Sequence, residues 1–139
     1  MGMKENRVLY SEPSDKSATL YKALGSALTS SYVAIGTEMP IENFTTAFLH
    51  VYWTKGDESS IEIKAEYALV SGGTKAQPTI VTTSAAESTI AIESFKFSTA
   101  TDNIIIPFGV NGNYINFYIK ATGGTPTGTY GAGIFLVRE

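Results

Sequence analysis

His50 is the single histidine of a chain that contains no cysteine. It lies in an apolar stretch from Phe48 to Trp53 that offers no acidic or nucleophilic neighbour. A catalytic triad or a metal centre needs such neighbours within bonding distance. We therefore predict that His50 packs internally or contacts a partner subunit. Its titration near neutral pH would make such a contact sensitive to pH.

The acidic residues with the most suggestive spacing, Glu62 and Glu66, do not fit an acid–base pair. Glycosidases need two carboxyl groups about 5–10 Å apart. Residues four apart along a strand are separated by about 13 Å. Lys64 lies between the two and would neutralise their charge rather than raise one pKa. A solvent-exposed strand face explains these three residues better than catalysis does.

Two further patterns fail as sites. Asp57-Glu58 lacks the repeated acidic ligands of a calcium loop, so it is predicted to form a turn. The pairs Gly72-Gly73 and Gly123-Gly124 connect apparent strands, with no helix start or Gly-Lys-Thr/Ser sequence after them, which argues against phosphate loops. The sequence therefore predicts no catalytic residue, no metal site and no cofactor, and the protein is not expected to be an enzyme.

Aromatic residues remain as candidates for binding. Six of them could form a platform for stacking sugars, but strand aromatics more often fill a core or a subunit interface, and we favour that interpretation. These six are Tyr52, Trp53, Tyr67, Tyr114, Tyr118 and Tyr130. The residues predicted to contact partners are Val8, Leu9, Tyr10, His50, Tyr118 and Tyr130.

These side chains would be positioned by strands, the central ones lying between Phe44 and Leu69. Ile61, Ile63, Ala65, Tyr67 and Leu69 alternate with polar residues, as in a strand with one buried face. The preceding run is apolar on both faces, as in a strand covered on both sides. The two runs are predicted to pair as a hairpin around Lys55-Gly56-Asp57.

About eight such strands, rich in Thr, Val, Ile and aromatic residues, predict an all-β antiparallel sandwich of jelly-roll-like topology. Leu20, Leu24 and Leu28 could mark a short helix, but Gly25 interrupts it and extended structure is favoured. A break in alternation predicts a bulge or bend near Glu93-Ser94. Residues 1–25 are predicted to be an extended N-terminal arm and residues 26–139 the sandwich domain.

Composition narrows the classes of partner. The formal charge of -3 gives no basic surface for nucleic acid. No apolar run approaches the ~20 residues of a membrane helix, and the first fifteen residues lack the apolar core of a signal peptide. Charged residues are scarce after Phe97, which suits a surface covered by other subunits. The four that follow are Asp102, Lys120, Arg138 and Glu139.

Three stretches resemble the small virion proteins of tailed bacteriophages. They are SALTSSYVAIG at Ser26–Gly36, the TKGDESSIEIKAEYAL segment, and IIIPFGVNGNYINFYIKATGGTPTGTYGAGIF at Ile104–Phe135. Together they cover 59 of the 139 residues. In the last of these stretches an apolar strand, a glycine-containing turn, an aromatic strand ending in Lys-Ala, a Gly-Thr-Pro-Thr-Gly turn and a closing strand follow one another. The resemblance rests on short sequence segments rather than on an invariant motif.

The resemblance implies a β-sandwich that decorates and stabilises the outside of a capsid, commonly as a homotrimer, without catalysis. The expected partners are other copies of the chain and the major capsid protein or another virion protein. The expected location is the virion, after synthesis in the host cytoplasm. The alternatives are a carbohydrate- or receptor-binding module and a structural subunit of the tail or neck.

Overall fold

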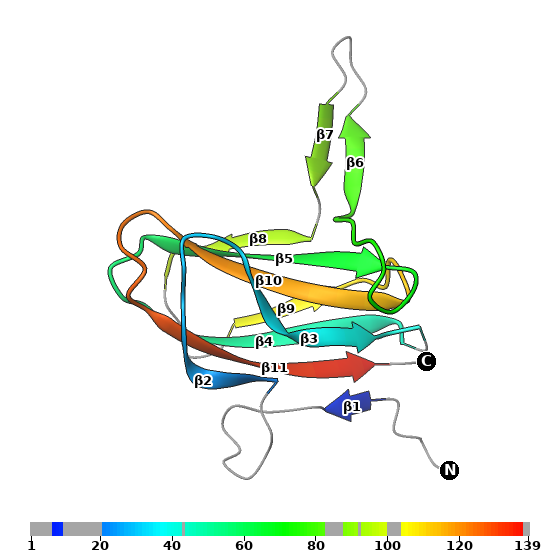
Figure 1. The fold of residues 1–139 in the computed structure, drawn as a ribbon, viewed down its shortest axis with the longest axis horizontal. Helices are drawn as coiled ribbons and strands as arrows, with labels where there is room; N and C mark the ends of the chain where they lie inside the picture. Colours follow the sequence, from blue (N-terminus) through cyan, green and yellow to red (C-terminus); the bar gives the residue numbers. More distant parts are fainter. Residues whose placement is uncertain are drawn as a thin grey trace.

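The computed structural model describes residues 7–9, 21–42, 44–82, 88–91, 93–99 and 104–137 (Figure 1). For residues 7–9, 79–82 and 88–91 only the backbone is described. The described residues form eleven strands and no helix. The strands are β1 Arg7–Leu9, β2 Lys22–Ala27, β3 Val33–Pro40, β4 Thr46–Thr54, β5 Ser60–Ala68, β6 Thr79–Thr82, β7 Ser88–Ala91, β8 Ser94–Phe97, β9 Ile104–Phe108, β10 Tyr114–Thr122 and β11 Thr129–Val137.

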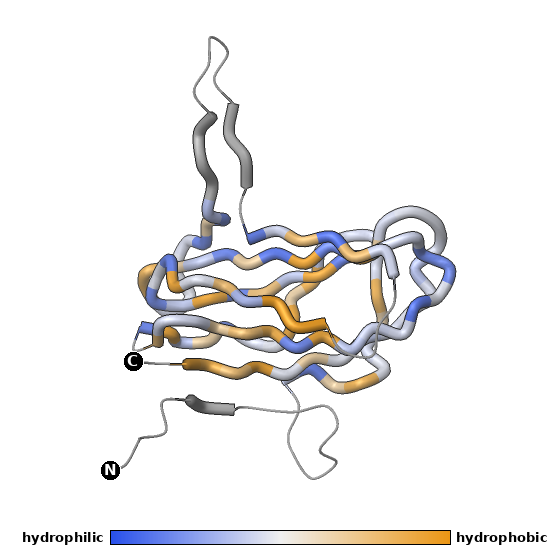
Figure 2. The backbone as a smooth tube through the Cα atoms, turned by 180° about the vertical axis from the view of Figure 1, so that it is seen from behind, coloured by the Kyte–Doolittle hydropathy of each residue, from blue (hydrophilic) through white to orange (hydrophobic). Residues whose placement is uncertain are grey.

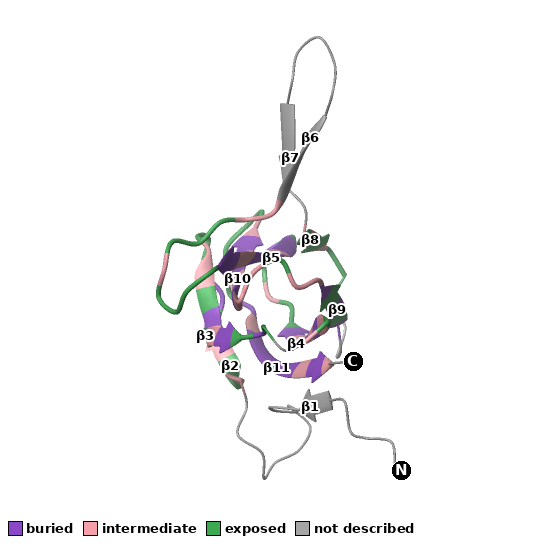
Figure 3. Cartoon of the chain, turned by 90° about the vertical axis from the view of Figure 1, so that its right-hand side faces the viewer, coloured by how far each residue is buried: buried purple, intermediate pink, exposed green. Residues whose placement is uncertain are grey.

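Two antiparallel sheets pack face to face (Figures 1 and 3). One has the order β1-β11-β4-β9, with β2 also paired to β11, and the other has the order β3-β10-β5-β8. β6 and β7 form a separate pair. The predicted all-β antiparallel sandwich is therefore confirmed.

The pairing of the strands is nested. β2 pairs with β11, β3 with β10, β4 with β9, β5 with β8, and β6 with β7. The chain thus folds as one long hairpin, with β6 and β7 at its tip, that is rolled into two layers. The first four of these pairs, which supply eight strands of the two sheets, make a jelly roll, the topology expected from the sequence.

The predicted hairpin between the two central strands is wrong. β4 pairs with β9 and β11, whereas β5 pairs with β8 and β10, so the two lie in opposite sheets. The Lys55-Gly56-Asp57 segment is a crossing between layers. A short connection can join two strands of one sheet or two strands of facing sheets. Each strand would bury the same residues in either arrangement.

The core lies between the sheets and follows the predicted alternation. Ile61, Ile63 and Ala65 of β5 are fully buried, and so are Leu49 and Val51 of β4. Burying each large aliphatic side chain contributes about 1.5–3 kcal/mol. Figure 2 shows the apolar segments running along the strands of the sandwich.

Leu69 is an exception to the predicted inner face. It lies beyond the end of β5 and is 72% exposed, as is the neighbouring Val70 at 63%. The chain turns at Ser71-Gly72, where Gly72 has a positive φ of 68°. The strand pairing therefore stops one residue before the alternation in the sequence does.

Extended structure, rather than a helix, is confirmed for residues 22–27, where β2 pairs with β11. The expected boundary between arm and sandwich, at residues 25 and 26, falls inside this strand. The predicted irregularity near Glu93-Ser94 is also found, because Glu93 has a positive φ of 59° just before β8 begins.

Candidate functional site

The outer surface of the β11-β4-β9 sheet carries no formal charge. On β4, Phe48, His50 and Tyr52 are half-buried and alternate with inward residues of the core. Gly133 of β11 and Ile105 of β9 flank His50 in register. We call this surface the apolar face, and it comprises Phe48, His50, Tyr52, Ile105, Pro107 and Phe135.

Aromatic and aliphatic groups lie side by side on the apolar face. The rings of Phe48 and Phe135, which are partners in register, have centroids 6.1 Å apart and planes inclined by 49°. Ile105 is 51% exposed on β9, which is the edge strand that its Pro107 favours. Such a combination is typical of the centre of a protein interface, where charged residues are depleted and aromatic residues enriched.

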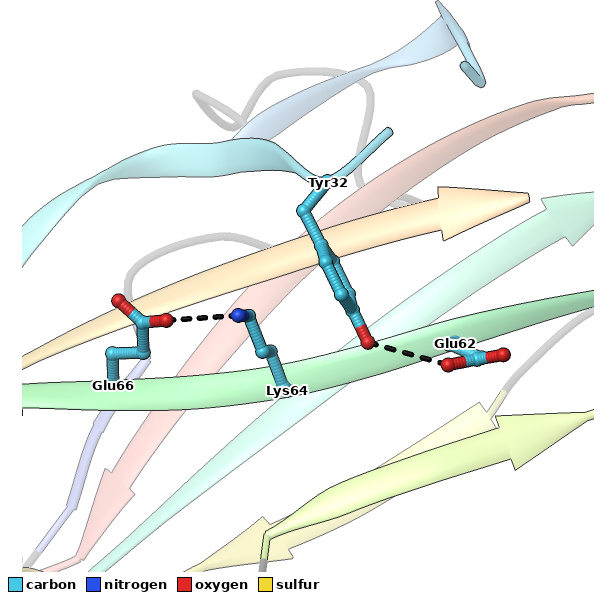
Figure 4. A network of polar contacts seen from close by, with 4 residues as sticks. All are labelled: Tyr32, Glu62, Lys64 and Glu66. Carbon is cyan, nitrogen blue, oxygen red and sulfur yellow. Dashed lines mark hydrogen bonds and ion pairs between the residues drawn. The ribbon is translucent and has the colours of Figure 1, made fainter. Parts of the chain in front are cut away.

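The outer surface of the opposite sheet is charged (Figure 4). The Nζ atom of Lys64 lies 2.8 Å from Oε2 of Glu66, and 4.3 Å from the ring centroid of Tyr32. The Tyr32 hydroxyl donates a 3.4 Å hydrogen bond to Glu62. Burial raises the pKa of Tyr32, and the charge of Glu62 adds to the rise. These groups bind one another, as expected of a solvated face.

The predicted contact residues do not gather in one place. His50 lies on the apolar face, whereas Tyr118 is half-buried on the charged face. The centroid of the Tyr118 ring lies 5.6 Å from Lys64 Nζ. Val8 and Leu9 belong to β1, which pairs with Leu136 and Phe135 of β11. Tyr10 lies outside the described residues.

Tyr130 is a correction to the predicted contacts. Its side chain is 1% exposed and packs in the core, because it falls on the inward face of β11. Burial raises its pKa to about 12, and its hydroxyl has no hydrogen-bond partner among the described residues. A residue enclosed in this way cannot contact a partner while the domain is folded.

The aromatic residues considered for sugar stacking also do not form a platform. Trp53 is 3% exposed and Tyr67 is 5% exposed, both within the core. Tyr52 lies on the apolar face and Tyr118 on the opposite sheet. The favoured interpretation, in which strand aromatics fill the interior, describes Trp53, Tyr67 and Tyr130.

Glu58 is a key residue that sequence analysis missed. Its carboxylate is fully buried and accepts four N–H donors. Trp53 Nε1 and Gly56 N donate to Oε2 at 2.9 and 2.8 Å. Thr127 N and Gly128 N donate to Oε1 at 3.1 and 2.9 Å. Glu58 thus joins the β4–β5 crossing to the β10–β11 crossing at one end of the sandwich (Figure 1).

The surroundings of Glu58 determine its charge state. Burial alone would raise its pKa, but the donors of Gly56, Trp53 and Gly128 outweigh burial and lower the pKa to about 2. Gly128 must remain glycine, because a Cβ atom there would collide with the Glu58 carboxylate. Nothing in the local sequence marks this residue, because two of its donors are about seventy positions away along the chain.

A pocket of about 320 Å³ lies beside the end of β5. Its walls come from β5, from the segment leading to β6 and from the β9–β10 loop. The residues that line it are Tyr67, Ala68, Leu69, Thr74, Ala76, Gln77, Pro78 and Asn111. Its volume falls at the lower end of the range for small-molecule sites.

Comparison with protein-family models, with curated proteins and with solved structures finds no match to this chain. The described residues contain no group of three or more His, Cys, Asp or Glu residues that could hold a metal ion. They also include no helix of the length and hydrophobicity needed to cross a membrane.

Proposed function

We propose that this protein is a non-enzymatic structural protein of a tailed-bacteriophage virion. In this role it decorates and stabilises the outside of the head shell as an oligomer, with a homotrimer expected. The observation that carries the proposal is the contrast between the two outer surfaces of the sandwich. One holds the Lys64–Glu66 ion pair and the tyrosines Tyr32 and Tyr118, whereas the apolar face holds three aromatic side chains, His50, Ile105 and Pro107.

An apolar face of this kind favours association, because removing its surface from water stabilises the bound state by about 25 cal/mol per Å² before the costs of association. A shell presents many equivalent sites, so an oligomer gains avidity through effective concentration. Subunits that bind only the assembled shell stabilise it by mass action. The jelly roll supports the proposal only by analogy, since viral capsid domains and lectins share it.

The β6–β7 ribbon also supports assembly. Among the described strands, these two pair only with each other, and they extend away from the sandwich (Figure 1). A two-stranded ribbon is marginally stable by itself in water. Its eight residues include no charge and are rich in Thr, Ile and Val, which favour strands. A neighbouring subunit that covers or extends the ribbon would stabilise it.

Co-sedimentation with head shells tests this proposal. The shells would be assembled from the major capsid protein encoded beside the gene for this chain. We expect saturable binding and a higher melting temperature of the decorated shells. Shells that sediment without the protein at any concentration would contradict the proposal, as would a gene neighbourhood that encodes no virion protein.

Substituting Ile105→Glu should weaken shell binding at least about tenfold, because a charge would be desolvated in the interface. Ile105 is half exposed, so the fold should be little affected. Ala34→Glu is the matched control, since it adds the same charge at an exposed position of β3 in the opposite sheet. Binding curves from the same co-sedimentation assay measure both. Equal loss in the two variants would show that net charge, and not the apolar face, controls binding.

Deleting Met1–Ser11 should leave a folded domain that assembles less well. The deletion removes β1, whose three residues pair with β11 at the edge of the sheet, but no described residue of the core. We expect a cooperative thermal transition to persist while the average mass in light scattering falls. If the truncated chain keeps the full oligomeric mass, the prediction is wrong and the arm does not contribute to contacts between subunits.

A tail or neck position is the alternative within the same class. It predicts the same apolar contacts with a different neighbour. Electron microscopy of particles labelled with an antibody against this chain separates the two, because label on the head supports decoration and label on the tail or neck contradicts it.

A further inference from the structure

We propose that the pocket beside the end of β5 binds a neutral, hydroxyl-rich ring, such as a saccharide unit. This activity goes beyond assembly and does not depend on it. The lining of the pocket combines apolar residues with residues that carry hydrogen-bonding groups. Ala68, Ala76 and Pro78 contribute apolar surface, and Thr74, Gln77 and Asn111 contribute hydroxyl and amide groups.

The chemistry of the lining excludes other classes of ligand. None of the eight lining residues is charged, so the pocket lacks the cation that would hold a phosphate or carboxylate and the carboxylate that would hold an amine. A purely apolar ligand would desolvate Gln77 and Asn111 without replacing their hydrogen bonds, which is costly. A sugar ring satisfies both kinds of surface, because its hydroxyls pair with amides and its C–H faces lie against apolar side chains.

Hydrogen bonds around the pocket hold its walls in place. The backbones of Tyr67 and Ala76 exchange two hydrogen bonds of 2.8 and 2.9 Å, which fix the segment that carries Gln77 against β5. Asn113 donates from its backbone to Ala68 O at 3.1 Å and from its side chain to Leu69 O at 2.9 Å. These contacts reduce the ordering cost that a ligand would otherwise meet.

Tyr67 connects the pocket to the strained residue Glu93. Tyr67 is one of the residues that line the pocket, and its hydroxyl donates to Gly109 O at 2.8 Å and also contacts the Glu93 carboxylate. Glu93 in turn accepts a 2.6 Å bond from Gly109 N and has a positive φ. Backbone conformations of this kind persist where the surroundings hold them in place, and they cluster at binding sites. In this protein the contacts of Glu93 with Tyr67 and Gly109 fix the start of the β9–β10 loop, which carries Asn111.

Nuclear magnetic resonance of the full chain tests the inference. The probes are glucose, galactose, mannose, rhamnose and N-acetylglucosamine, each titrated against ¹⁵N-labelled protein. We expect at least one sugar to shift the side-chain amide signals of Gln77 and Asn111 in a saturable way. No shift with any of the five, or shifts centred on Tyr32 and Tyr118 of the charged face, would overturn the proposal.

A pair of variants makes the test specific. Gln77→Met keeps the length of the side chain but removes its hydrogen bonds, and should weaken the strongest sugar at least about tenfold. Lys75→Met is the control, since the exposed Lys75 lies between two lining residues without lining the pocket, and it should bind as the parent does. Undiminished binding by Gln77→Met would overturn the proposal. Oligomeric mass, measured on the same samples, should be unchanged in both variants, so sugar binding and assembly can fail independently.

Discussion

Replacing Glu58 by glutamine is expected to lower the free energy of unfolding by about 3 kcal/mol, because each buried donor that is left without an acceptor costs about 1–3 kcal/mol. Both carboxylate oxygens face N–H donors, with Trp53 and Gly56 on one and Thr127 and Gly128 on the other. A glutamine amide would point its NH₂ group at one of these pairs in either orientation. Two donors would then lose their acceptor.

Urea unfolding followed by tryptophan fluorescence measures this effect, since Trp53 is the one tryptophan and binds Glu58 directly. Asp57→Asn is the matched control, because it makes the same chemical change at the adjacent, exposed residue. Its effect should be within about 0.5 kcal/mol. Equal stabilities of the two variants would mean that the carboxylate does not join the two crossings.

Protonation of the Glu58 carboxylate should account for part of the loss of stability of the domain in acid. The pKa of Glu58 is lowered from 4.5 to about 2 in the folded state. Its contribution to stability is therefore present above pH 4.5 and is lost as the pH falls from 4.5 towards 2. The parent protein should lose more stability across this interval than Glu58→Gln does. Parallel pH profiles for the two proteins would contradict the assignment.

Ile63→Asp is expected to abolish the folded state. Ile63 is fully buried on β5, in register with Ile119 of β10 and Phe95 of β8. Removing the apolar side chain costs about 2–5 kcal/mol, and burying an unpaired carboxylate adds several more. The sum is comparable to the whole stability of a domain of this size, about 5–15 kcal/mol.

Thermal circular dichroism would show this loss as the absence of a cooperative transition. Glu62→Gln is the control on the opposite side of the same strand, where Glu62 faces Tyr32. Its expected effect is within about 0.5 kcal/mol. If Ile63→Asp melts like Glu62→Gln, the assignment of inner and outer faces on β5 is wrong.

Local pattern was sufficient to predict which side of most strands is buried. The alternation around Ile63 identifies an inner face without any knowledge of the neighbouring strands, because side chains on a strand have a period of two. The expected number of strands and the jelly-roll topology also follow from short, regularly spaced runs. The partners of each strand could not be read in this way, so the crossing at Gly56 was interpreted as a hairpin.

The sites depend on contacts between distant residues, which a single sequence does not display. In the sequence Glu58 looks like an ordinary turn residue, because the donors Thr127 and Gly128 lie beside it only in the folded structure. His50 and Tyr118 are both aromatic strand residues, but only the assignment of β4 and β10 to different sheets separates their surfaces. Tyr130 was predicted to contact a partner, yet its side chain lies in the core.

Sedimentation velocity of the purified chain, alone and mixed with head shells, is the most direct test of the claim that the apolar face binds other subunits. We predict a species at a multiple of the 14.9 kDa chain mass, together with protein that moves with the shells. A species at the mass of one chain, with every shell sedimenting bare, would contradict it.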